Sequence, residues 1–499
     1  MMTSIRTRAA LVAIATIGGV VFAAVVAFTL AAGPGGPIPP TRTASPAATA
    51  DVSPTTGPET TPTTEYPEVD GVRALEHVRY LADPARGGRY TASSGYEDAA
   101  GYVADRFAEA GLEPWGDGGS FFQSFRMPLV DLAATPVLED TGGDREYQHR
   151  VDFTERVGGM FGSGDAQGQL AFVGSGSADD LAKVEVRGKV AVVVLAGRAD
   201  PARTLAARGA VALIYVSSSI LKFSYLPRFD PAALPAVVVT TAVANELLAP
   251  SGRSVSELAA AVDAQSRSGG PSPAFELATR LRVAVPLTPV REVEAMNVVG
   301  LLRGSDPEAA KRAVVVGGHL DGVGTDPDGT VFEAANDNAS GPAVTIEVAR
   351  ALAQRRAELV HSVIFVAFAA EEQGFFGSEA FVEQFAALPG RRESLIGYVN
   401  LDVVGCCGGT VSASNESTAM VARARDAAEK IGAPFGSEGA GSSDQVSFSR
   451  RGIHATLLNW STIGPIHTTA DTVARITAES LRTIGRVAAL MTLEMAAGR

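Results

Sequence analysis

The sequence predicts an α/β protein built on a doubly wound mixed sheet with helices on both faces, plus a small β-rich domain inserted into it. After residue 280, short apolar strands alternate with amphipathic helices, which is the pattern of a sheet covered on both sides. The run Val363–Ala369 is apolar throughout, as expected for a strand that is buried on both faces. From Gly164 to Ala264 the pattern changes to short β-rich runs separated by glycine-containing turns, which predicts the inserted domain.

The individual elements follow from the spacing of apolar residues. Two N-terminal helices are expected at 72–81 and 96–110, the first with an apolar face that includes Val72, Leu75 and Val78, and Gly111 stands where the second helix should end. The inserted domain has four expected strands, at 170–173, 190–195, 210–216 and 236–240. The larger domain has expected strands at 297–302, 313–316, 363–369, 398–404 and 455–459, and expected helices at 341–353 and 478–497.

Length, charge and cysteine content limit the class of protein. The 499 residues exceed one ordinary domain, and 46% hydrophobic residues are enough for a large core. The formal net charge is −13, whereas phosphate binding requires clustered Lys and Arg, so nucleic acid is not expected as a partner. The two cysteines, Cys406 and Cys407, are adjacent, so they are either two small buried hydrophobic side chains or a vicinal disulfide.

The N-terminal segment predicts export. Arg6 and Arg8 precede an apolar run over residues 9–32, which exceeds the roughly 18 residues that suffice to span a bilayer. Positive charge ahead of such a run predicts a cytoplasmic N-terminus. Residues 1–32 are therefore interpreted as an uncleaved signal anchor in preference to a cleaved signal peptide. The rest of the chain is expected outside the cytoplasm, either attached to the cell membrane or secreted.

The remaining residues divide into a linker and two folded parts. Residues 33–66 are rich in Pro, Thr and Ala and cannot bury a core, so they predict an extended spacer. The expected division of the folded chain is the N-terminal part of the larger domain at 67–163, the insertion at 164–264 and the main part of the larger domain at 265–499.

Seven histidine and acidic side chains lie at or beyond the ends of the expected strands, in the order His319, Asp321, Asp337, Glu371, Glu372, Asp402 and His467. In open α/β sheets, ligands bind beyond the carboxyl ends of the strands, so these side chains are expected to converge. Histidine nitrogen and carboxylate oxygen are ligands that zinc accepts. The sequence therefore predicts a zinc site at this edge of the sheet. The other histidines, His77, His149, His361 and His454, fit no metal motif and are interpreted as structural.

The number of ligands fits two metal ions if Asp337 bridges them. His319, Asp337 and Asp402 then supply three bonds to one zinc ion. Asp337, Glu372 and His467 supply three bonds to the other. A shared water or hydroxide fills the fourth position of each, which is the open position that a catalytic zinc site requires.

Glu371 and Asp321 remain without a metal bond. A carboxylate beside a metal-bound water is suited to act as a general base, so Glu371 is expected to take a proton as the hydroxide attacks a carbonyl carbon. Asp321 lies two residues from His319 and is expected to hold its second ring nitrogen, which fixes the tautomer. The alternatives are a surface position for Glu371 and a local turn cap for Asp321.

These motifs resemble those of metallopeptidase family 28, the di-zinc aminopeptidases and glutamate-carboxypeptidase-like enzymes, in the same order along the chain. The matching segments are Gly-Gly-His319-Leu-Asp321, Asn-Asp337-Asn-Ala-Ser-Gly, Ala-Glu371-Glu372-Gln-Gly, Asn-Leu-Asp402 and His467-Thr-Thr-Ala-Asp471-Thr. Gly87-Gly88-Arg89 also looks like the N-terminal half of the family. The resemblance implies a zinc-exopeptidase-like fold, two Zn²⁺ per chain and release of N-terminal residues from peptides.

Two further segments bear on this resemblance. The insertion resembles a protease-associated (PA) domain, at Val186-Arg-Gly-Lys-Val-Ala-Val and Leu234-Pro-Ala-Val-Val-Val. The family commonly has Tyr before the last histidine, where its hydroxyl assists the developing oxyanion, but this chain has Ile466. Ser442-Ser443-Asp444 falls where the family has a motif at the edge of the pocket, and a plain polar loop is the alternative.

The predicted function is therefore that of an exported di-zinc aminopeptidase, with peptides as substrates and a membrane contact through the N-terminal segment if that segment is not cleaved. Two alternatives use the same fold. One is a carboxypeptidase-like or glutaminyl-cyclase-like activity at the same metal site. The other is a non-catalytic scaffold containing the PA domain, which is expected to lack metal ligands, whereas all five are present here.

Overall fold

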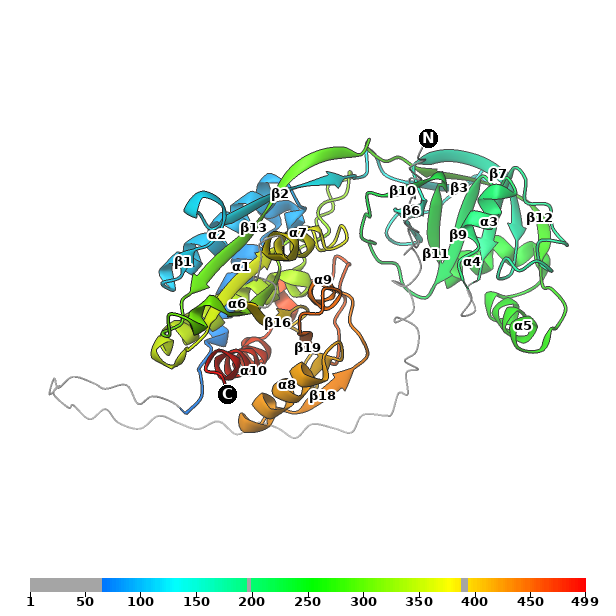
Figure 1. Ribbon diagram of the computed structural model, residues 1–499. Helices are drawn as coiled ribbons and strands as arrows, with labels where there is room; N and C mark the ends of the chain where they lie inside the picture. The colour runs from blue at the N-terminus through cyan, green and yellow to red at the C-terminus, as the bar shows by residue number, and fades with distance from the viewer. Residues whose placement is uncertain (1–64, 195–198, 387–393) are drawn as a thin grey trace, which may run out of the picture. The chain divides into compact units, whose positions relative to one another are not determined.

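The computed structural model describes residues 65–194, 199–386 and 394–499 (Figure 1). The expected signal segment at 1–32 and nearly all of the linker at 33–66 lie outside these residues. Within the described ranges, no helix combines the length and apolar character needed to cross a membrane. Residues Tyr66–Arg499 form one compact unit.

The larger sheet has the strand order β1–β13–β15–β14–β16–β19–β17–β18, with β2 also paired to β13. The strands are β1 Glu113–Pro114, β2 Phe122–Leu129, β13 Arg291–Leu302, β14 Ala313–His319, β15 Ser362–Phe368, β16 Leu395–Leu401, β17 Val411–Ser414, β18 Phe435–Glu438 and β19 Ala455–Trp460. Strands β15, β14, β16 and β19 run parallel, whereas β13 is antiparallel to β15 and β17 is antiparallel to β19. The predicted mixed sheet is therefore confirmed.

Helices cover both faces of the larger sheet. Its helices are α1 Gly71–Leu81, α2 Ser94–Glu109, α6 Ser340–Ala353, α7 Phe376–Ala386, α8 Thr418–Lys430, α9 Gln445–Ser449 and α10 Ala478–Ala496. Alternate residues of β15 belong to different apolar clusters: Val363 and Phe365 to one, Ile364 and Val366 to the other. The first cluster includes residues of α1, α2, α6, α8 and α10, and the second includes residues of α7 and α9. The apolar run of β15 thus reflects burial on both sides, as predicted.

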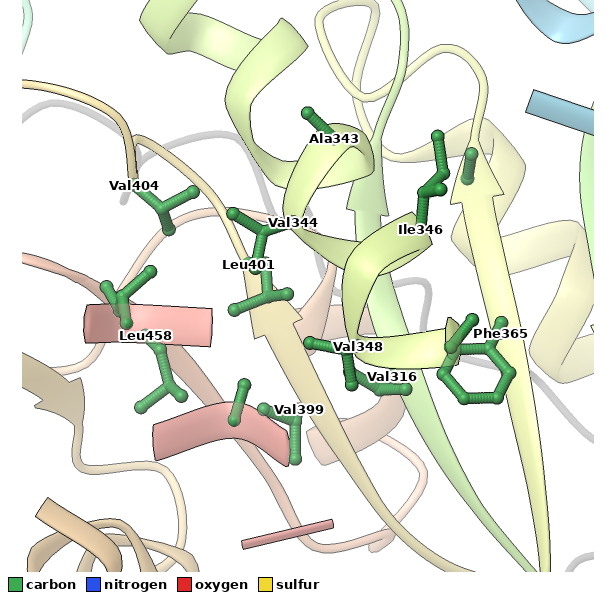
Figure 2. Packing of buried hydrophobic residues seen from close by; sticks show 14 of the residues in the cluster. Val316, Ala343, Val344, Ile346, Val348, Phe365, Val399, Leu401, Val404 and Leu458 are labelled. Carbon is green, nitrogen blue, oxygen red and sulfur yellow. The ribbon is translucent and has the colours of Figure 1, made fainter. Parts of the chain in front are cut away.

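Helix α6 shows how the sheet and its cover pack together (Figure 2). Val344 and Val348 of α6 lie in one buried cluster with Val316 of β14 and Val399 and Leu401 of β16. Burying each such side chain contributes roughly 1.5–3 kcal/mol. This packing fixes the helix against the two strands whose ends carry His319 and Asp402.

Helix α1 departs from its predicted apolar face. Asp70 caps it, because its carboxylate accepts the backbone N–H groups of Val72 and Arg73, each at 3.0 Å. Val72, which the pattern places on the buried face, is 62% exposed. The small residues Gly71 and Ala74 are buried instead, since Gly71 lies against the backbone of α10 and a Cβ there would approach Ala478 O to 1.9 Å.

The smaller sheet has the order β4–β3–β12–β7–β8–β9–β11–β5. Its strands are β3 Val137–Asp140, β4 Arg145–Glu146, β5 Phe153–Glu155, β7 Gly164–Phe172, β8 Lys189–Val193, β9 Ala212–Ser217, β11 Ala236–Thr240 and β12 Phe275–Val285, and its helices are α3 Ala202–Ala207, α4 Thr241–Leu248 and α5 Val255–Ser268. A separate pair, β6 Gly159–Phe161 and β10 Phe229–Leu234, runs parallel. The sheet extends beyond the predicted range 164–264, because the strand that enters it, β3, and the strand that leaves it, β12, pair with each other.

The two cysteines are joined by a disulfide. Cys406 is buried and Cys407 is exposed, so the interpretation of two buried hydrophobic side chains is wrong for the second of them. The bond lies four to five residues beyond Asp402, at the same end of the larger sheet.

Candidate metal centre

The carboxyl ends of four neighbouring parallel strands deliver most of the predicted site residues. His319 is the last residue of β14, and Asp402 directly follows β16. Glu371 and Glu372 lie just beyond β15, and His467 lies in the loop after β19. These strands are adjacent in the order β15–β14–β16–β19, so their ends meet at one edge of the sheet. Asp337 reaches the same edge from η5 Ala335–Ala339, the turn that leads into α6.

Five of the side chains form two trios that share Asp337. His319 Nε2 lies 3.2 Å from Asp337 Oδ1 and 3.2 Å from Asp402 Oδ1. His467 Nε2 lies 3.1 Å from Asp337 Oδ2 and 3.2 Å from Glu372 Oε1. The two oxygens of Asp337 therefore face different histidines, which is the arrangement that a carboxylate bridging two cations requires.

The donor chemistry of the two trios fits zinc. In each trio one imidazole nitrogen and two carboxylate oxygens lie within 4.8 Å of one another. Three such ligands with an open fourth position characterise a catalytic zinc site. The carboxylates are buried or nearly so, and burial of like charges at this spacing is unfavourable unless cations are present. The trios can thus hold one cation each.

The electrostatics of the two histidines reflect the same excess of negative charge. Burial by itself lowers the pKa of His319, but the charges of Asp402 and Glu371 outweigh it and raise that pKa well above its ordinary value. Burial opposes protonation of His467 as well, and Glu372 and Asp337 raise its pKa in the same way. A buried imidazole and a half-buried one, both surrounded by carboxylates, mark a site suited to metal ions.

Asp321 is placed differently from its predicted contact. The Nδ1 atom of His319 lies 3.1 Å from the backbone carbonyl oxygen of Asp321, whereas the Asp321 carboxylate is 3.7 Å away. The carboxylate instead accepts the backbone N–H groups of Glu371 and Glu372, each at 3.2 Å. Asp321 therefore holds His319 through its main chain and holds the Glu371–Glu372 turn through its side chain.

Glu371 lies beside the two trios that share Asp337 and belongs to neither of them. A carboxylate oxygen of Glu371 lies within 4.8 Å of ligand atoms of His319 and Glu372. Burial raises the pKa of Glu371 well above its ordinary value; the charge of His319 opposes this and the charge of Glu372 adds to it. A raised carboxyl pKa near the reacting groups is what a general base at neutral pH requires. The alternative of a surface position does not describe this residue, which is half-buried.

Asp471 and Arg89 support the site, although neither was predicted to have a role in it. The Asp471 carboxylate accepts the backbone N–H groups of Asn336 at 2.8 Å and Asp337 at 3.0 Å, which holds the bridging residue. Burial raises the pKa of Asp471 to about 6. The signal was present in the sequence, because Asp471 belongs to the same quoted motif as His467.

Arg89 lies in the quoted Gly-Gly-Arg segment and is completely buried. Its guanidinium donates to the carbonyl oxygens of Leu320 at 2.8 Å and Ala334 at 2.8 Å, on the two segments that carry His319 and Asp337. Burial lowers its pKa to about 10, so it stays charged at neutral pH. Arg89 thus ties the two segments together through their main chains.

Two glycines allow the site segments to approach β16. A Cβ atom at Gly318 would lie 2.0 Å from Leu401 O, and one at Gly341 would lie 2.1 Å from the same oxygen. Any side chain at either position would push the His319 strand end or the start of α6 away from β16. This explains the glycines that flank the two motifs.

The segment at 442–444 and the four other histidines lie outside the trios. Ser443 and Asp444 are buried, and burial raises the pKa of Asp444 to about 7. A role of this segment at the edge of a pocket stays a prediction. Ser443 Oγ accepts the Nδ2 hydrogen bond of Asn400 at 2.9 Å. The histidines predicted to be structural make hydrogen bonds elsewhere, namely His77 to Tyr102, His149 to Glu155, His361 to Ala309 O and His454 to Ser417.

Part of the chain, including this site, matches the model of a known peptidase family. Residues 297–492 match the model of peptidase family M28, and all seven predicted site residues lie in that range. The resemblance to this family that the motifs predicted is confirmed over this range, whereas the resemblance of the insertion to a PA domain stays a prediction.

Several curated proteins are similar over parts of their length. The chain is 31% identical to aminopeptidase YwaD of Bacillus subtilis over 208 residues, which is 38% of this chain and 42% of that protein. It is 38% identical to a probable zinc metalloprotease of Leptosphaeria maculans over 115 residues, 23% of this chain and 25% of that protein. The chain thus spans between a quarter and about two fifths of the length of these relatives.

The fold is shared with solved structures, among them two aminopeptidases. An aminopeptidase from Aneurinibacillus sp. strain AM-1 superimposes with a TM-score of 0.65 at 22% identity, covering 86% of this chain and 94% of that one. The zinc aminopeptidase BSAP from Bacillus subtilis gives 0.61 at 20% identity, covering 87% and 96%. The mixed α/β architecture is therefore that of known aminopeptidase structures.

Proposed function

We propose that this protein is an exported di-zinc exopeptidase that releases N-terminal residues from peptides. The observation that carries the proposal is the pair of trios that share Asp337, with Glu371 beside them. Both similar curated proteins and similar folds include aminopeptidases, which supports the substrate class. Export rests on the apolar run at 9–32 behind two arginines.

The chain's own residues supply binding and proton transfer. Zinc ions held by the two trios would acidify a water molecule and polarise the scissile carbonyl. Glu371 takes a proton from the attacking water as the new C–O bond forms, then donates it to the departing amine as the C–N bond breaks. The Asp321 carboxylate holds Glu371 in place by accepting a hydrogen bond from the backbone N–H of Glu371. Ile466 has no hydroxyl group with which to stabilise the oxyanion. That stabilisation would therefore have to come from zinc ions held by the two trios.

Metal analysis combined with a peptide panel tests the proposal. The purified chain is expected to hold about two zinc ions and to cleave peptides that have a free amino terminus. N-acetylated versions of the same peptides serve as the matched control and are expected to resist cleavage.

Three results would contradict it. Cleavage that is indifferent to acetylation but requires a free carboxyl terminus would replace the aminopeptidase with a carboxypeptidase. Conversion of N-terminal glutamine to a cyclic product would indicate a cyclase. Absence of bound zinc together with absence of cleavage would indicate a scaffold.

A further inference from the structure

The loop between β9 and β10, residues 218–228, comes from the region of the smaller sheet but contacts the candidate metal centre. Ser224 Oγ donates a hydrogen bond of 2.9 Å to Glu372 Oε2. The backbone N–H of Lys222 donates to His467 O at 2.9 Å. Glu372 and His467 belong to the same trio, so this loop touches two of the three residues that would hold one cation.

Buried ion pairs hold the loop in this position. Lys222 Nζ lies 3.0 Å from Asp326 Oδ1, and both side chains are almost completely buried. Asp326 also accepts from Arg150, whose Nε lies 2.7 Å from Asp326 Oδ2. Arg150 Nη2 in turn lies 2.7 Å from Oε1 of Glu155 in β5. Removing one member of such a network would leave a buried charge unpaired, so the loop is firmly placed.

Neighbouring residues of the loop line the same side of the site. Lys222 to Tyr225 border a narrow space together with Tyr90, Val323, Glu372 and Gln373. Further along, the guanidinium of Arg228 lies 5.0 Å from the ring centroid of Phe376. The loop therefore follows the segment that begins at Glu371 and continues into α7.

We propose that Ser224 is a positioning residue for the metal centre: its hydroxyl holds Oε2 of the Glu372 carboxylate, which would leave Oε1, the oxygen nearer His467, to bind a cation. The two oxygens of Glu372 have different neighbours, with Ser224 Oγ 2.9 Å from Oε2 and His467 Nε2 3.2 Å from Oε1. A carboxylate held in this way offers one oxygen to a cation in a fixed direction. The region of the smaller sheet thereby contributes one contact to a residue of the site.

This inference rests on the proposed metal site and predicts a selective effect. Removing a side chain that is hydrogen-bonded to a metal ligand typically lowers metal affinity or activity by about 10–100-fold. Through Glu372, Ser224 contacts the trio of Asp337, Glu372 and His467, and in the described part of the chain its hydroxyl makes no hydrogen bond to His319 or Asp402. Loss of its hydroxyl is therefore expected to weaken the binding of one zinc ion and to spare the other.

The test compares zinc affinities of the full chain after metal removal, using competition with a chelator of known affinity. The variants are Ser224→Ala and the isosteric pair Ser224→Thr and Ser224→Val, of which only the Thr variant keeps a hydroxyl. Ser219→Ala is the matched control, because Ser219 is an exposed serine of the same loop. The expected result is a loss of about 10–100-fold for one zinc ion in the Ala and Val variants, with the Thr and Ser219 variants close to wild type.

Equal affinities in the Thr and Val variants would overturn the inference, and so would an equal loss in Ser219→Ala. Because Thr and Val have the same shape, their comparison remains valid if the Ala variant does not fold. Peptide cleavage by the wild-type chain is measured in parallel. A wild-type chain that binds two zinc ions but cleaves no peptide would contradict the proposed function and leave the role of Ser224 to be decided by the affinities. A wild-type chain that binds no zinc would overturn both.

Discussion

Two buried clusters of charged side chains in this protein differ in how their charge is balanced. In the cluster beside the smaller sheet, Glu155 and Asp326 are paired with Arg150 and Lys222 at 2.7–3.0 Å. At the end of the larger sheet, by contrast, Asp337, Glu371, Glu372 and Asp402 surround two imidazoles. The first cluster is complete without any ion, whereas the second has an excess of negative charge.

The difference teaches that burial of acidic residues alone does not indicate a metal site. The informative feature is a set of buried carboxylates whose compensating charge is missing from the protein itself. Among the described residues, every trio of histidine and acidic groups with metal-binding spacing lies at the larger sheet. The parallel strands β9 and β11 of the smaller sheet end instead in Ser217 and Thr240.

The largest expected effect is at Glu371, which is assigned to proton transfer in the acidic cluster at the end of the larger sheet. Glu371→Gln should retain zinc and lower kcat by about 10²–10⁴-fold, because the amide cannot accept the proton of the attacking water. Steady-state kinetics and metal content measured on the same sample check this. The control is Glu383→Gln, an exposed position on α7. Near-normal turnover in the Glu371 variant would remove the residue from this role.

A smaller effect is expected at Asp321, which belongs to neither trio but holds the turn that carries Glu371 and Glu372. Asp321→Asn keeps one acceptor oxygen where two now receive the N–H groups of Glu371 and Glu372. We expect a loss of about 10–100-fold in kcat or in zinc affinity. The exposed Asp328 of the same loop provides the matched control as Asp328→Asn. Equal behaviour of the two variants would show that the Asp321 carboxylate has no part in organising the site.

The smallest expected effect is at Glu155, in the ion-paired cluster beside the smaller sheet. It is a change in how the free energy of unfolding depends on pH. Burial raises the pKa of Glu155, but Arg150 and His149 outweigh it and hold the pKa well below its ordinary value. A lowered folded-state pKa contributes stability that is present above the unfolded value of about 4.3 and is lost as the pH falls below it. The contribution lost by pH 3 is on the order of 1–2 kcal/mol.

Thermal unfolding between pH 6 and pH 3 checks this sign. The midpoint should fall less steeply in Glu155→Gln than in wild type, since the variant lacks the titrating group. Glu429→Gln, an exposed position on α8, should follow the wild-type curve. A Glu155 variant with the wild-type pH slope would mean that Glu155 does not titrate differently in the folded and unfolded states.

Much of the larger sheet could be predicted because its strands are continuous apolar runs. The expected strand at 363–369 corresponds to β15 Ser362–Phe368, and the expected helix at 341–353 corresponds to α6 Ser340–Ala353. Strand β2 was missed, since Phe122–Leu129 mixes buried and exposed positions and contains Pro128. The extent of the smaller sheet was also missed, because β3 and β12 are joined by pairing across more than a hundred intervening residues.

The sequence by itself determined which residue types are available for the site and their order along the chain. Strand ends can be recognised from local apolar runs, and in a parallel sheet these ends meet, so the convergence of His319, Glu372 and Asp402 follows from local pattern. Only the tertiary structure decided the contacts that depend on distant backbone. Asp321 meets the turn after β15, and Ser224 reaches Glu372 across 148 positions of the chain. Such contacts leave no local periodicity, because they are fixed by how separate segments pack rather than by the residues next to them.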